Sequence, residues 1–169
     1  MNSTLNAWNT LAPEAAVAVL LSCCASHCWA QAVASQRPYA SEQELFQAAD
    51  TIWATMTEPD WMEAFGAHPR IGERKPAHAT AQSSAWSQQE QFATNTAEQN
   101  ILAKLAAGNL RYEELFGFTY IVCATGKSAD EMLAILERRL TSDRAAELRE
   151  AAEQQRQITQ IRLRKWLQT

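Results

Sequence analysis

Three histidines occur in this chain of 169 residues, and one of them, His68, lies at a stiff corner of the backbone. It precedes Pro69 in the stretch AFGAHPRIGE, between Gly66 and Gly72, which permit close approach of other backbone. A residue before proline is disfavoured in the α region, and loops held on a rigid scaffold are where binding residues gather. Because imidazole titrates near neutral pH, we predict acid–base chemistry for His68. A capping or core role is the alternative for a lone histidine.

A second candidate is Glu90, in the stretch WSQQEQ. It lies four residues after Trp86 and three before Ala93, so a helix here would place its carboxylate on an apolar face. A carboxylate in such a place is costly unless it is paired or hydrogen-bonded, and a histidine or an arginine would be its natural partner. The alternative needs no function, because Ser87 and Glu90 also match the S-x-x-E capping box.

The third candidate is Arg162, near the end of the chain. It falls inside an apolar stripe of the last expected helix, which is formed by Leu148, Ala151, Ile158 and Trp166. Either its stem covers apolar surface while its head group stays in water, or its guanidinium points inward and grips a carboxylate or carbonyl. One imidazole, one inward carboxylate and one inward guanidinium describe a small polar pocket for an anionic substrate.

Composition restricts the class of protein. The length favours one domain with one core, residues 1–169, and hydrophobic residues make up 47% of the chain. The net charge is −4 and the sequence pI is near 5.4, which argues against a nucleic-acid partner. Glycine and proline are scarce, five of each, while helix-forming residues are plentiful.

The cysteines and the apolar stretch near the N-terminus argue against a metal site and a membrane. Cys23, Cys24 and Cys28 crowd one short segment, and no second cluster completes a zinc pattern, so we expect buried reduced thiols in a cytoplasmic protein. The stretch over 14–34 contains Glu14, His27 and Gln31 and is too broken to span a bilayer. It predicts one core helix or two short ones.

Helix-start signals recur along the chain and predict its elements. They occur at Pro13, Ser41, Pro59, Ser83 or Ser84, Ser128 and Asp143. Ser41 and Glu44 match a capping box, and the helix from Pro59 should stop before His68. The helix from Ser83 or Ser84 runs on, with or without a break, through residues 100–116, where Ile101, Leu105, Tyr112 and Leu115 recur at helical spacing.

The run FGFTYIVCAT, residues 116–125, is apolar and rich in β-branched residues, which favours a strand. No second strand candidate exists to pair with it, so we predict a buried extended segment instead. The whole pattern predicts an all-α, single-domain bundle of about seven to nine helices.

Several stretches together resemble a known family, the 2-oxo-4-hydroxy-4-carboxy-5-ureidoimidazoline (OHCU) decarboxylases. The resemblance rests on LSCCASHCWAQAVASQRPYASEQEL, DWMEAFGAHPRIGE, SQQEQ, YEELFGFTYIVCATGKSADEMLAILERRL and QITQIRLRKWL, in the order in which the family has them. It implies an all-helical carboxy-lyase of urate degradation that uses neither cofactor nor metal and converts OHCU to (S)-allantoin and CO₂. The family also suggests a homodimer.

The resemblance also implies site residues. His68, Glu90 and Arg162 match the family's catalytic positions. Substrate contacts are implied, partly through main-chain groups of the apolar run, at Pro69, Ser87, Gln88, Gln89, Glu90, Gln91, Phe118, Tyr120, Ile121, Val122, Cys123, Ala124 and Arg162.

Two other functions fit the same residues. A helical sensor of a ureide or purine metabolite would keep the pocket without catalysis. A protein-interaction scaffold would use the three polar residues as caps and surface groups, and it predicts an exposed apolar patch in place of a pocket.

Overall fold

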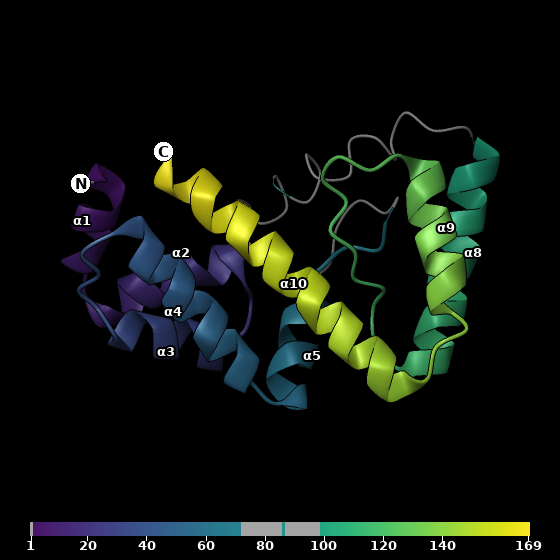
Figure 1. Cartoon of the computed structure of the whole chain (residues 1–169), viewed down its shortest axis with the longest axis horizontal. Coiled ribbons are helices and arrows are strands. Elements are labelled where there is room, and N and C mark those ends of the chain that lie inside the picture. The colour runs from purple at the N-terminus through teal and green to yellow at the C-terminus, as the bar shows by residue number, and fades with distance from the viewer. Residues whose placement is uncertain (1, 72–85, 87–98) are drawn as a thin grey trace. The chain divides into compact units, whose positions relative to one another are not determined.

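The computed structural model describes residues 2–71, 86 and 99–169, and this part of the chain is all-α, as predicted (Figure 1). It contains eight helices and no strand. They are α1 (Ser3–Asn9), α2 (Pro13–Cys23), α3 (His27–Ser35), α4 (Glu42–Thr55), α5 (Glu58–Gly66), α8 (Gln99–Phe116), α9 (Ala129–Arg139) and α10 (Arg144–Leu167). None of these helices is both long enough and apolar enough to cross a membrane.

The chain divides into two compact units, each of which is described by itself. The first comprises Met1–Ala64 and Arg156–Thr169, and the second comprises Phe65–Gln155. The helix α10 contributes residues to both units. The prediction of one domain over residues 1–169 stays a prediction.

The core of the first unit contains two buried tryptophans, one on α1 and one on α3. Trp8 and Trp29 are at most 2% exposed, and each indole N–H donates to a main-chain oxygen, of Ala16 and of Ala49 respectively, over 3.0 Å. A buried indole usually finds such a partner, because an unpaired N–H away from water is costly. The tryptophans thereby tie α1 to α2 and α3 to α4.

The apolar stretch over 14–34 forms two short helices. The helix α2 begins at Pro13, where a proline fits because the first amides of a helix have no partner within it. It ends at Cys23, and Ser26 then caps α3 by accepting from the amide of Trp29 over 3.3 Å. The two helices pack against each other, which buries one face of each.

The start of α4 follows the prediction only in part. Ser41 Oγ accepts from the amide of Glu44 over 3.2 Å, as predicted. The return bond differs, because the Glu44 carboxylate accepts from the amide of Ala40, one residue before the cap. The predicted capping box at α4 is therefore wrong in this bond, although the amide it stabilises is adjacent.

In the second unit α8 packs against α9. Gly108 makes the close approach possible, since a Cβ at this position would lie 2.6 Å from Leu136 Cδ2. Leu105 and Tyr112 are fully buried on α8, as their spacing predicts, but Leu115 is 52% exposed and does not belong to the buried face. The predicted cap of α9 is confirmed, because Ser128 and Glu131 form a complete capping box.

Candidate active site

His68 lies in the connection after α5, which is irregular as the sequence predicts, and its side chain is half-buried. The helix ends at Gly66, and the amide of His68 donates to the carbonyl of Phe65 over 3.0 Å. The helix thus stops before the residue that precedes Pro69. The prediction that Gly66 permits a close approach of other backbone is wrong for the described residues. Its φ is not positive, and a Cβ there would meet no neighbouring described atom within 4 Å.

The imidazole of His68 is held by a buried amide. Its Nε2 lies 2.7 Å from Oε1 of Gln155, which is fully buried on α10. A side-chain amide oxygen only accepts hydrogen bonds, so the proton of this contact belongs to Nε2. In the neutral ring, Nδ1 is then the nitrogen with the basic lone pair.

The apolar run over residues 116–125 lies outside regular structure, as predicted, except for Phe116, which ends α8. Its residues 118–125 lie between two left-handed glycines, Gly117 with φ 81° and Gly126 with φ 78°, and glycine adopts this conformation without a steric penalty. Gly117 also closes α8, because its amide donates to the carbonyl of Glu113 over 2.8 Å. The predicted contact residues of this run are at most 7% exposed: Phe118, Tyr120, Ile121, Val122, Cys123 and Ala124.

Three side chains anchor the main chain of this run. Arg139 Nη1 donates to the carbonyl of Ile121 over 2.6 Å, and the amide of Cys123 donates to Oε1 of Gln154 over 2.8 Å. Lys127 Nζ donates to the carbonyl of Cys123 over 2.7 Å. Each of three successive peptide groups, from 121 to 124, therefore has one polar atom fixed by a side chain.

These anchors determine where the atoms of Val122 point. Both of its peptide bonds are trans, and in a trans peptide the carbonyl oxygen and the amide hydrogen lie on opposite sides. The Val122 N–H therefore points away from Arg139, and the Val122 carbonyl points away from Gln154. In the described part of the chain the Val122 N–H has no hydrogen-bond acceptor. A buried residue with such a group can donate to a ligand.

The amide of Cys123 does not have this freedom. The resemblance implies ligand contacts through main-chain groups of the run, and the Cys123 N–H is already bonded to Gln154. The prediction therefore applies to the other amides of the run, and most directly to that of Val122.

A buried ion pair supports the run from behind. Arg139 and Glu147 are at most 1% exposed and form a salt bridge, and the Tyr112 hydroxyl donates to the same carboxylate. Burial, the largest single influence, would lower the pKa of Arg139, but the hydrogen bond to Glu147 together with the charge interactions with Tyr112, Glu147 and Tyr120 raises it. For Tyr112 the effect of burial has the opposite sign: burial raises its pKa, and Glu147 adds a smaller rise. Arg139 thus stays charged and Tyr112 stays a donor.

Arg162 points inward, as its place in the apolar stripe predicts. It lies on α10 in the first unit and is 2% exposed, so its head group is not in water and the surface alternative is wrong. Its positive charge lowers the pKa of the neighbouring thiols of Cys23 and Cys24, but burial dominates and raises these values to about 12 and about 11. A catalytic or binding role for Arg162 stays a prediction.

The remaining predicted residues of the site, Ser87, Gln88, Gln89, Glu90 and Gln91, lie outside the described residues. His68 and Arg162 belong to different units. The convergence of His68, Glu90 and Arg162 on one pocket therefore stays a prediction.

The sequence analysis missed two polar residues of the candidate site: Gln155 on α10, which bonds to His68, and Arg139 on α9, which bonds to Ile121. Gln155 lies four residues after Ala151 and three before Ile158, both of which are buried, so the helical period does place it inward. Arg139 gives a weaker signal. It is the last residue of α9, and a cation in the last turn of a helix is common without any further role.

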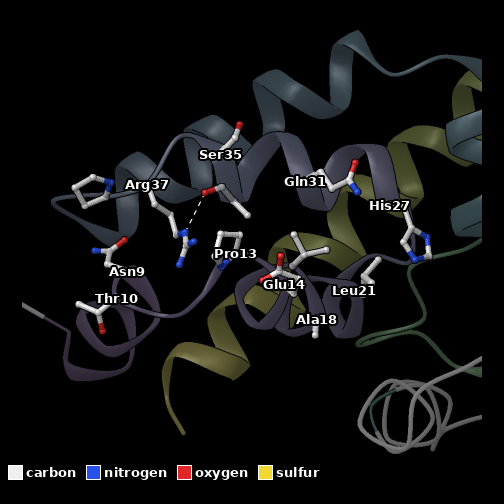
Figure 2. A pocket seen from close by; sticks show the side chains of 13 residues that line it. Asn9, Thr10, Pro13, Glu14, Ala18, Leu21, His27, Gln31, Ser35 and Arg37 are labelled. Carbon is white, nitrogen blue, oxygen red and sulfur yellow. Dashed lines mark hydrogen bonds between the residues drawn. The ribbon is translucent and has the colours of Figure 1, made fainter.

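A separate cavity of about 1010 Å³ lies in the first unit, lined by residues from α1, α2 and α3 and the turns beside them. Figure 2 shows Leu21 and Ala18 of α2 and Gln31 of α3 among the residues that line it. Two of its polar side chains have partners: Arg37 donates to three main-chain oxygens, and His27 contacts Glu63. Among the described residues, no predicted site residue lines this cavity.

These features define the class of protein: an all-α chain with a half-buried imidazole and an anchored, non-helical main-chain segment, each bonded to one of two adjacent residues of α10. A model of the OHCU decarboxylase family matches residues 9–164, and the chain belongs to this family.

Named relatives agree with the family. The chain is 35% identical over 146 residues to the uric acid degradation bifunctional protein TTL of Arabidopsis thaliana. The matched region covers 85% of this chain but only 44% of the relative. It is 26% identical over 139 residues to the OHCU decarboxylase of Amia calva, covering 82% of this chain and 79% of the relative. The chain thus spans less than half of the length of the bifunctional protein.

Solved structures show the same fold. A crystal structure of OHCU decarboxylase in the presence of (S)-allantoin has a TM-score of 0.75 and 33% sequence identity, over 88% of this chain and 96% of the other. A crystal structure of (S)-allantoin synthase has a TM-score of 0.69 at 16% identity, over 96% of this chain and 53% of the other, which is a likeness of fold alone.

Proposed function

We propose that this protein is a carboxy-lyase that decarboxylates OHCU to (S)-allantoin and CO₂ in urate degradation. The observation that carries the proposal is the imidazole of His68, which Gln155 holds half-buried in the unit that also contains the anchored run. The similarity to an OHCU decarboxylase solved with (S)-allantoin supports the same substrate class.

The chemistry follows from the substrate's name, which places a hydroxyl and a carboxylate on C4 and the ureido group on C5. When CO₂ leaves, the electron pair of the broken bond moves into the adjacent C=N of the ring, whose nitrogen takes a proton from solvent. This leaves a double bond between C4 and C5. The 4-hydroxyl proton passes to His68 as a carbonyl forms at C4, and the electron pair of the C4=C5 bond takes one proton on a single face of C5, because the product is chiral. Such general acid–base help is worth about 10²–10⁴-fold in rate.

The protein must also orient the substrate and stabilise the charge that moves into the ring. In this proposal Arg162 and Gln91 bind the ureido and carbonyl oxygens, and Glu90 orients the imidazole or relays its proton. The Val122 N–H and carbonyl offer one donor and one acceptor, the pattern that an edge of a cyclic amide complements. Pro69 and the rest of the residues matched by resemblance complete the contacts.

The test uses the purified protein with freshly generated OHCU and follows optical rotation, because only enzymatic turnover forms one enantiomer of allantoin rapidly. We expect His68→Asn to lower the rate by about 10²–10⁴-fold and to keep the thermal unfolding midpoint of the unchanged protein. Binding of OHCU without turnover by the unchanged protein would favour the sensor, and retention of most of the rate by the variant would remove His68 from the mechanism.

The scaffold alternative finds less support in the described surface. Its exposed large apolar side chains are Leu11, Leu110 and Leu115. Leu110 and Leu115 are five residues apart on α8, a spacing that puts them on different sides of a helix. The protein-interaction alternative would need these side chains to share one face.

Two further expectations belong to the proposal. The four cysteines are all free thiols, which supports a cytoplasmic location, where thiols are kept reduced. The homodimer suggested by the resemblance stays a prediction, and light scattering of the purified chain would test it.

A further inference from the structure

The two consecutive glutamines of α10, Gln154 and Gln155, each hold one part of the candidate site. Gln154 accepts from the amide of Cys123, and Gln155 accepts from the ring of His68. Both contacts come from adjacent positions on one long helix, so the imidazole and the anchored run share a rigid support. Nothing in the similarity to the family assigns a part to either glutamine.

Gln155 constrains the ring chemically as well as sterically. Its side chain is fully buried, and its oxygen lies 2.7 Å from His68 Nε2. If the proton of the neutral ring moved to Nδ1, two acceptors would face each other across this contact, and both would be desolvated. The Nε2–H form of the ring is therefore favoured at this site.

We propose that Gln155 is the positioning residue of His68: it holds the proton on Nε2 and so makes Nδ1 the nitrogen that exchanges a proton with the substrate. The identity of that substrate rests on the proposed function, while the form of the ring does not. During the reaction Nδ1 takes the 4-hydroxyl proton and the ring becomes an imidazolium, which still donates from Nε2 to Gln155. When Nδ1 gives up its proton, the starting form returns.

The ring form is measured directly in protein labelled with ¹⁵N-histidine, by long-range ¹H–¹⁵N correlation spectra recorded at the alkaline end of a titration. The two nitrogens of a neutral imidazole have well-separated shifts, so the spectrum shows which one carries the proton. His68→Asn removes one set of signals and thereby assigns it. We expect His68 in the unchanged protein to be in the Nε2–H form.

Two substitutions at one position test the role of the amide. Gln155→Met has nearly the same shape but no acceptor, and we expect it to shift His68 toward a mixture of ring forms and to lower kcat by about 10–100-fold, with a smaller change in KM. Gln155→Glu keeps an acceptor at the same reach, and we expect it to restore the Nε2–H form and part of kcat. Gln43→Met, at an exposed position on α4, is the matched control and should change neither.

The outcomes separate this inference from the proposed function. His27, whose Nδ1 lies 2.6 Å from Glu63, is an internal reference that should keep its spectrum in every variant. An Nδ1–H ring in the unchanged protein would overturn the inference, as would Gln155→Met with an unaltered spectrum. If Gln155→Met does not fold, loss of the Nε2–H pattern in Gln155→Glu would overturn it equally. A changed spectrum in a protein that never turns over OHCU would leave the inference standing and remove the decarboxylase.

Discussion

At the scale of single residues, the second unit contains a buried cation, Arg139, with several hydrogen-bond partners. Arg139 bonds to the Glu147 carboxylate, to the Tyr112 hydroxyl and to the Ile121 carbonyl, and it is fully buried. A buried charge is tolerated only when it is paired in this way, and removing one partner leaves the other uncompensated. The ion pair therefore orients the run more than it stabilises the fold.

Substitution of one partner should consequently be severe. We expect Arg139→Met to lower the free energy of unfolding by about 3–5 kcal/mol, because Glu147 would remain buried without its cation. The double variant Arg139→Met with Glu147→Leu should recover part of this loss, since no lone charge remains. Urea unfolding followed by circular dichroism measures both. A loss near that of a surface substitution, about 0.5 kcal/mol, would contradict this account of the pair.

At the scale of elements, the sequence predicts what depends on neighbouring residues. The caps of α4, α9 and α10 are readable because Ser41, Ser128 and Asp143 each bond to an amide three residues ahead. The contact of His68 with Gln155 joins positions 87 residues apart and follows from tertiary packing. No local pattern contains that information, which is why the sequence predicts a polar pocket but not the contact of His68 with Gln155.

The turn between α8 and the apolar run gives an element-scale prediction. Gly117 has φ 81°, so Gly117→Ala should lower the free energy of unfolding by about 1–2 kcal/mol through steric strain. Gly66→Ala is its control: that glycine ends α5 without a positive φ and with open space at its Cβ, so the variant should be unchanged or more stable by about 0.4–1 kcal/mol. Equal losses in both variants, measured by thermal and urea unfolding, would show that backbone handedness is not the cause.

At the scale of the whole molecule, the buried thiols of the first unit make stability depend on alkaline pH. Burial raises the pKa of Cys23 to about 12 and that of Cys24 to about 11, from an ordinary value of 9.0. Below pH 9 both states of the protein carry these protons. Above it the unfolded chain loses them while the folded chain keeps them, so stability falls as pH rises from 9 through the folded values.

The slope of this loss is measurable. Each thiol contributes up to about 1.4 kcal/mol per pH unit between its two pKa values. We therefore expect the free energy of unfolding to fall steeply between pH 9 and pH 10.5, and less steeply in the variant Cys23→Ala with Cys24→Ala. Urea titrations at a series of pH values give both slopes. Parallel slopes in the two proteins would assign the alkaline loss to groups other than these thiols.

The anchored main chain of residues 121–124 has a consequence for how related proteins are compared. In the proposed function these peptide groups contact the ligand, and peptide groups present the same atoms whatever side chains the chain carries there, provided that the backbone keeps its course. Exchanges among apolar residues at Val122 would thus leave recognition intact, whereas a proline would abolish it by removing the N–H. When related proteins are compared for function, the residues that anchor this segment are therefore more informative than the side chains of the segment itself. These anchors are Arg139, Gln154 and Lys127.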